Sequence, residues 1–300
     1  MSKTPALGTL RVSTGPSPIA HEHARLLRTA LRRGELEPEI APRTKLVGDF
    51  APEAIAIARA SWMLRMAHEH QSSAVFSRLL PQLIEAEVDL EWKTVALRMS
   101  MDELRHAALS GDVVRLLGAK PEVQTRLVTE PLPEHPDASP RERALRNVLF
   151  ACCLSESLAA PLLSAERDLC GEPSISKVLQ QLAADETLHA RYGWSYLQHH
   201  WPLLSDEERE RTNAYLPVAL ASIETRFVDA LPDAPLPPPE QEAQLAALGV
   251  TMPARARALA REVLEHVIVI ALQEAGLDAQ RAWQRRGVSP ETGSEGSEAS

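Results

Sequence analysis

Apolar residues recur at intervals of three and four along most of the chain, and no run alternates apolar and polar residues for long. This spacing is typical of amphipathic helices that pack on one another. It predicts four long helices, at about residues 52–80, 89–117, 139–167 and 174–201. The pattern therefore predicts an all-α protein.

Residues with strong terminal preferences support these limits. Pro81 is expected to stop the first helix, and Gly118 suits the C-terminus of the second. Ser139-Pro140-Arg141-Glu142 has the form of a capping box with proline at the first helical position. A second capping box begins at Ser205 and opens a helix that we expect to reach about Leu231.

The lengths of the connections predict the topology. About eight residues join the first helix to the second, and a similar number join the third to the fourth. About twenty residues, 118–138, lie between the two pairs, which is long enough to cross the length of a bundle. Two hairpins joined by one long crossover indicate a ferritin-like four-helix bundle, here with extra C-terminal helices.

The chain is expected to divide into four parts. Residues 1–48 form an N-terminal segment, partly disordered and with a short helix near 21–34, and residues 49–201 form the bundle. Additional helices occupy 202–278, among them one at about 253–275, and a proline-rich linker lies at 232–239. The Ser/Glu/Gly-rich end, 279–300, is expected to be disordered.

One motif occurs twice, on the second and fourth predicted helices. Asp102-Glu103-Leu104-Arg105-His106 and Asp185-Glu186-Thr187-Leu188-His189 both read Asp-Glu-x-x-His. A glutamate and a histidine three positions apart share a helix face, so both can reach one point. Imidazole and carboxylate together suit iron, manganese or zinc. A single copy would be weak support for a metal site, but two copies on paired helices are much stronger.

The other two helices each place one glutamate on a stripe that is otherwise apolar. These are Glu69 on the first helix and Glu156 on the third. Four buried carboxylates at one level would cost several kcal/mol each without partners, on the order expected for buried ions. Two divalent cations would remove that cost. Asp102 and Asp185 lie one residue from the ligand positions and are candidates to hold an imidazole of the opposite hairpin, and Arg105 could pair with one of them.

This set of residues resembles the ferritin-like di-iron carboxylate superfamily over about residues 50–200, and Asp-Glu-Leu-Arg-His is similar to the motif of di-iron oxygenases and acyl carrier protein desaturases. The resemblance implies two Fe ions, with Mn or a mixed Fe/Mn pair as alternatives. It implies that Glu103 and Glu186 bridge the metals, that Glu69 and His106 complete one, and that Glu156 and His189 complete the other. It further implies O₂ activation on a small organic substrate, with an electron-donor protein as a further partner.

Charge and cysteine content narrow the function classes. The net charge of −9 argues against nucleic-acid binding, including a transfer-RNA hydroxylase, and no apolar run is long enough for a membrane span. The three cysteines form no Cys-x-x-Cys pair, which weakens a rubrerythrin-like peroxidase. A cytoplasmic protein is expected. A ferroxidase, a manganese catalase and a metal-binding bundle without catalysis remain alternatives, and a homodimer is left open.

Several other polar residues near the motif have simpler explanations. Cys152 and Cys153 lie one turn before Glu156 and are interpreted as small core residues, with a redox role as the alternative. Tyr192 and Tyr196 follow His189 by one and two turns and are interpreted as packing residues. His68 and His70, which flank Glu69, are expected to point elsewhere, and Ser73 and Ser110 could leave space near the metals.

Overall fold

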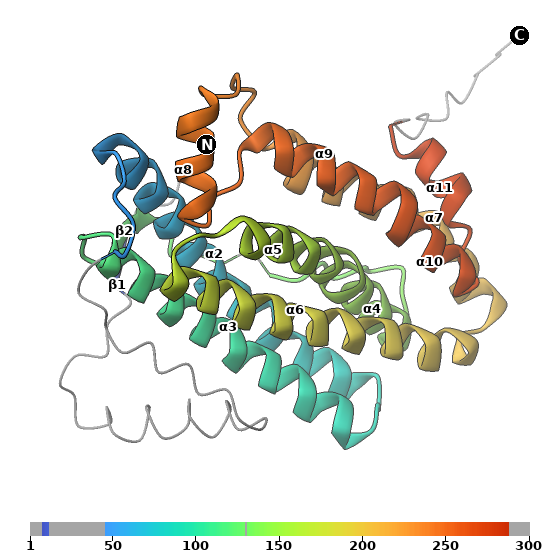
Figure 1. The fold of residues 1–300 in the computed structure, drawn as a ribbon. Coiled ribbons are helices and arrows are strands. Elements are labelled where there is room, and N and C mark those ends of the chain that lie inside the picture. The colour runs from blue at the N-terminus through green and yellow to red at the C-terminus, as the bar shows by residue number, and fades with distance from the viewer. Residues whose placement is uncertain (1–7, 12–45, 130, 288–300) are drawn as a thin grey trace, which may run out of the picture.

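The computed structural model describes residues 8–11, 46–129 and 131–287, and it is built almost entirely of helices (Figure 1). The four longest helical stretches form the bundle. They are α2 (Pro52–Glu85), α3 (Leu90–Leu116), the third stretch made of α4 (Pro140–Val148), η1 (Leu149–Glu156) and α5 (Ser157–Leu169), and α6 (Pro173–His200). The all-α prediction and the four predicted helices are confirmed. The short helix expected near 21–34 lies outside the described residues.

The first helix is longer than expected. Pro81 lies inside α2, which continues to Glu85, so the predicted stop at Pro81 was wrong. The last turn is held by the burial of Leu83, which is fully enclosed, and this burial offsets the backbone hydrogen bond that proline cannot donate. The chain then reverses at Glu87, whose φ of 56° is in the left-handed region.

The third stretch begins as predicted and then changes its helical pitch. The Ser139 side chain accepts a hydrogen bond from the Glu142 backbone N–H, as expected of a capping residue. From Leu149 to Glu156 the backbone is a π-helix, which is uncommon and often found at functional sites. The segment η1 ends on Glu156, one of the predicted ligands. The uniform helical period used to place Glu156 therefore does not hold there.

The crossover contains a strand, which the sequence analysis did not predict. Strand β2 (Glu122–Thr125) pairs antiparallel with β1 (Gly8–Arg11), with Gly8 opposite Thr125. Residues 8–11 belong to the segment expected to be partly disordered. The side chain of Gln71 on α2 donates a hydrogen bond to the carbonyl of Arg126, just after β2, at 3.0 Å. This contact fixes the start of the crossover against the first hairpin.

The C-terminal helices cover one side of the bundle. After a short turn, η2 (Trp201–Leu203), come α7 (Asp206–Glu224) with its π-helical end η3 (Thr225–Asp229), α8 (Pro239–Ala247), α9 (Pro253–Val263), η4 (Leu264–Ile268), α10 (Val269–Glu274) and α11 (Ala279–Arg285). The capping box at Ser205 is confirmed, with both reciprocal hydrogen bonds formed. Helix α11 lies within 279–300, which we expected to be disordered. Its buried Ala279 and Ala282 pack on the rest of the core.

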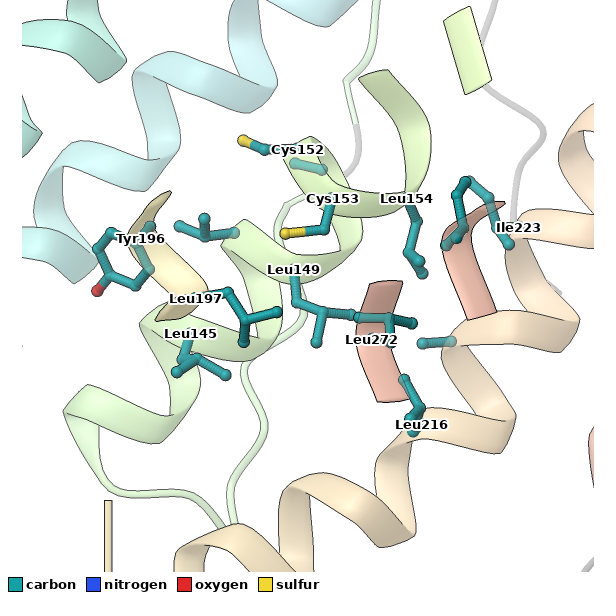
Figure 2. Close-up of a cluster of buried hydrophobic side chains, with 14 of the residues drawn as sticks. Leu145, Leu149, Cys152, Cys153, Leu154, Tyr196, Leu197, Leu216, Ile223 and Leu272 are labelled. Carbon is teal, nitrogen blue, oxygen red and sulfur yellow. The ribbon is translucent and has the colours of Figure 1, made fainter. Parts of the chain in front are cut away.

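The third stretch is enclosed on two sides. Figure 2 shows Leu149 and Leu154 of η1 between Leu197 of α6 and the side chains of Leu216 and Leu272 from α7 and α10. Among the described helices, Pro140–Leu169 is long and apolar enough to cross a membrane by length and composition alone. Half of its most apolar window is buried inside the protein, as is usual for the central helix of a bundle.

Candidate metal centre

All six predicted ligands meet at one level of the bundle. Glu69 comes from α2, Glu103 and His106 from α3, Glu156 from the end of η1, and Glu186 and His189 from α6. Five of the six are buried, and the Glu69 side chain is 13% exposed. One apolar cluster lies on each side of this level, one around Phe76 and Leu149 and the other around Trp62 and Leu182. These clusters shield the five buried side chains from solvent.

The ligand atoms form two groups that share one glutamate. Glu69, Glu103, His106 and Glu186 form the first group, here named position 1, and Glu156, Glu186 and His189 form the second, named position 2. Within each group the oxygen or nitrogen atoms lie within 4.8 Å of one another. Glu186 therefore lies between two potential metal positions.

Glu103 also faces both imidazoles. One of its oxygens, Oε1, is 3.8 Å from Nδ1 of His106 and 3.3 Å from Nδ1 of His189. Glu186 approaches the same two nitrogens, at 3.1 Å and 2.8 Å. These distances give Glu103 and Glu186 the placement that bridging ligands need. That they bridge metals stays a prediction.

The two aspartates of the motifs stand behind the histidines of the opposite helix. Asp185 on α6 lies 3.0 Å from Nε2 of His106 on α3, which is a hydrogen bond. Asp102 on α3 lies 3.6 Å from Nε2 of His189 on α6, which is too long for one. Arg105 is buried between the aspartates, hydrogen-bonded to Asp185 and 3.7 Å from Asp102.

Sequence reasoning missed two residues that hold these aspartates. Arg98 donates from Nε to both oxygens of Asp102, at 2.9 and 3.0 Å, and Gln181 donates to Asp185 at 2.9 Å. Each lies four positions before its aspartate, so each shares a helix face with it. This repeated spacing is a signal that the sequence contained.

Burial and mutual repulsion shift the protonation of the metal-free cluster. Burial, together with the charge of Glu186, raises the pKa of Glu103 to about 8 and that of Glu156 well above its usual range. Burial alone would lower the pKa values of both imidazoles, but the charge of Glu186 and the surrounding carboxylates raise them well above the usual range. Without metal, the cluster therefore holds protons where cations could stand.

The same groups fit a metal ion better than they fit each other. Oε1 of Glu103 and Nδ1 of His106 are buried and lack a hydrogen-bond partner within the described residues. Buried polar atoms without partners are costly, and a cation coordinated between them would satisfy both. The mixture of carboxylate oxygen and imidazole nitrogen suits iron, manganese or zinc. The buried cluster therefore fits a metal site, and the donor types leave the metal open.

The cysteine, tyrosine and serine residues that the sequence analysis placed near the site are buried or half-buried. Cys152 and Cys153 are fully buried, and burial raises the pKa of both thiols, so both stay protonated. Tyr192 is buried and donates its hydroxyl hydrogen bond to the carbonyl of Trp92 at 3.1 Å. Ser73 donates to the carbonyl of His70 at 2.7 Å, whereas the Ser110 hydroxyl is buried without a partner in the part of the chain described.

Comparison with known proteins agrees with this fold. No protein-family model and no curated protein matches the chain. A solved structure described as a protein with aldehyde deformylating oxidase activity from Synechococcus matches with a TM-score of 0.52 at 16% sequence identity. The match covers 79% of this chain and all of that one. The chain therefore has the fold of a ferritin-like four-helix bundle, extended by C-terminal helices.

Proposed function

We propose that this chain is a non-haem di-iron or di-manganese protein that activates O₂ to oxidise a small organic substrate. The observation that carries the proposal is the convergence of four glutamates and two histidines from four helical stretches at one buried level. Apolar clusters on both sides limit the access of water to that level. Such exclusion favours oxidative chemistry by limiting side reactions.

A reduced metal pair would supply electrons to O₂, and the protein residues would hold and orient that pair. Glu69 and His106 would hold one metal, Glu156 and His189 the other, and Glu103 with Glu186 would lie between them. Asp185 accepts the hydrogen bond from Nε2 of His106, which leaves Nδ1 free to face the metal. Cation binding would also displace the protons that the metal-free cluster retains.

The name of the structural neighbour supports testing an aldehyde first. The neighbour is described by an aldehyde deformylating oxidase activity, and the likeness to it is one of fold. We therefore propose an aldehyde as the first substrate to test, with O₂ and an electron-donor protein as partners. We further propose a cytoplasmic location.

Metal content and oxygen consumption test the proposal. We expect about two metals per chain after anaerobic loading with Fe²⁺. When O₂ and an aldehyde are then added, O₂ uptake should continue while a reductant is supplied, and the aldehyde should be consumed. Glu186→Ala should lose both metals because Glu186 belongs to both groups. Glu53→Ala, an exposed glutamate in the first turn of α2, is the matched control and should keep both.

Three outcomes would contradict the proposal. A protein that binds no metal would be a bundle with a buried polar network. Uptake of O₂ that scales with added Fe²⁺ and yields mineralised iron would indicate a ferroxidase. A bound pair that leaves every organic substrate unchanged would indicate metal binding without the proposed oxidation.

A further inference from the structure

The two motifs differ at one position that bears on the metal site. The first reads Asp-Glu-Leu-Arg-His and the second Asp-Glu-Thr-Leu-His, so Arg105 has Leu188 as its counterpart. Only one guanidinium therefore reaches the pair of aspartates from within the motifs. Arg105 is hydrogen-bonded to Asp185, whereas its nearest approach to Asp102 is 3.7 Å. The two copies of the motif therefore differ in how the aspartate behind each histidine is hydrogen-bonded.

At position 1, the aspartate behind the histidine is hydrogen-bonded to that histidine and to two further side chains. Asp185 accepts hydrogen bonds from Arg105, from Gln181 at 2.9 Å and from Nε2 of His106 at 3.0 Å. This last bond fixes the imidazole plane and leaves Nδ1 facing Glu186 at 3.1 Å. Nδ1 is buried and has no hydrogen-bond partner among the described residues, so a cation there would break no hydrogen bond.

At position 2, the aspartate behind the histidine makes no hydrogen bond to that histidine. Arg98 takes both oxygens of Asp102, and its own side chain is one-third exposed at the surface. Asp102 stays 3.6 Å from Nε2 of His189, and this nitrogen has no hydrogen-bond partner within the described chain. The ligating nitrogen, Nδ1, is instead hydrogen-bonded to Glu186 at 2.8 Å. A metal at position 2 must break that bond and bind an imidazole whose Nε2 makes no hydrogen bond in the described part of the chain.

The glutamates that belong to one position only differ as well. Glu69 lies within the regular helix α2, but Glu156 is the last residue of the π-helical segment η1. A π-helix is a rare departure from the regular α-helix, so we expect Glu156 to be held less firmly than Glu69. This difference, like the hydrogen bonds of Asp185, favours position 1.

We propose that the two metal positions are unequal and fill in order, position 1 first and position 2 second, because Arg105 and Gln181 fix the imidazole of His106 through Asp185. This inference rests on the proposed function, since it assumes that the cluster binds metal. Loss of a hydrogen-bonded residue behind a metal ligand usually weakens metal affinity about 10- to 100-fold. The first affinity should therefore exceed the second by about that factor.

Anaerobic titration of the metal-free protein with Mn²⁺ tests the order without any activity assay. Calorimetry should give two binding steps, and electron paramagnetic resonance should show an isolated Mn²⁺ at one equivalent and a coupled pair at two. Glu156→Ala should keep the tight first step and lose the second. Glu69→Ala should lose the tight first step.

The aspartates provide a matched pair of variants. Asp185→Asn should weaken the first step about 10- to 100-fold, while Asp102→Asn should leave it unchanged. Leu188→Arg would place a guanidinium where the first motif has Arg105, and it should strengthen the second step relative to Leu188→Met. Circular dichroism checks that each variant is folded.

A single binding step, two equal affinities, or a first step weakened by Asp102→Asn would overturn the inference and leave the proposed function standing. An unchanged second step in folded Leu188→Arg would overturn the cause assigned to the difference. Wild-type protein that binds no Mn²⁺ and no Fe²⁺ would overturn both the inference and the proposed function.

Discussion

Replacing Gly193 with alanine should destabilise the protein, although alanine is the better helix former. Gly193 lies within α6, one turn after His189, where α6 meets η1. A Cβ atom there would lie 2.5 Å from Cβ of Cys152 and 2.9 Å from both the carbonyl carbon of Cys152 and the backbone nitrogen of Cys153. Carbon atoms in contact normally stand about 3.5–4.0 Å apart, so α6 and η1 would have to separate by about 1 Å.

Two opposing terms set the size of the effect. Glycine to alanine in a helix interior gains about 1 kcal/mol of helix propensity. Overpacking a core costs about 1–3 kcal/mol, and the upper end applies here because two of the three atoms met are backbone atoms. The net loss in unfolding free energy should be about 2 kcal/mol. The same separation moves His189 away from Glu156, so metal affinity at position 2 should fall as well.

Denaturant unfolding of the metal-free protein measures this loss. Ser195→Ala, on the exposed face of the same helix, is the control and should be neutral or slightly stabilising. A Gly193→Ala protein that is about 1 kcal/mol more stable than wild type would show that propensity alone acts. That result would refute the close approach of α6 and η1.

Further predictions concern charge. In the metal-free protein, the pKa of Glu103 is raised to about 8, and the pKa values of His106 and His189 are raised as well. The native cluster therefore binds more protons than the unfolded chain, and the free energy of unfolding should fall as pH rises from about 5 to 8. Thermal unfolding should show this slope, and Glu103→Gln should flatten it. Metal binding should release protons, so the heat measured by calorimetry at pH 7 should depend on the buffer, and metal affinity should rise with pH. A heat that does not depend on the buffer would contradict the raised pKa values. Glu142→Gln should lower the free energy of unfolding by about 3–5 kcal/mol, because Glu142 is fully buried between two arginines. The control Arg209→Ala removes an exposed ion pair and should change it by less than about 1 kcal/mol. Similar losses in the two variants would contradict the burial argument.

The fold was largely predictable because periodicity and end signals agree in this chain. Asp89 and Ser139 precede helices that begin where the pattern placed them, and the long crossover fixed the pairing of the hairpins. The end of α2 was not predictable, because tertiary burial of Leu83 outweighs the local effect of Pro81. Strand β2 was missed because a four-residue strand gains its hydrogen bonds from a partner far away in the sequence.

The candidate site was predictable for a different reason. A duplicated motif at fixed helical spacing places its residues on one face whatever the exact helix limits are. Glu69 and Glu156 were placed by helix phase alone, and the π-helical turns of η1 shift the phase by which Glu156 was found. The unequal hydrogen bonds of Asp102 and Asp185 depend on where Arg98 and Gln181 reach, and spacing alone does not give those distances.

The burial of the third stretch on both sides affects how the chain can be shortened. Leu149 and Leu154 of η1 contact α6 on one side and the helices after residue 204 on the other (Figure 2). A fragment that stops at residue 201 would expose these leucines to water and would be prone to aggregate. The segment that carries Glu156 therefore depends on sequence that follows the bundle, and both parts should melt together in one cooperative transition.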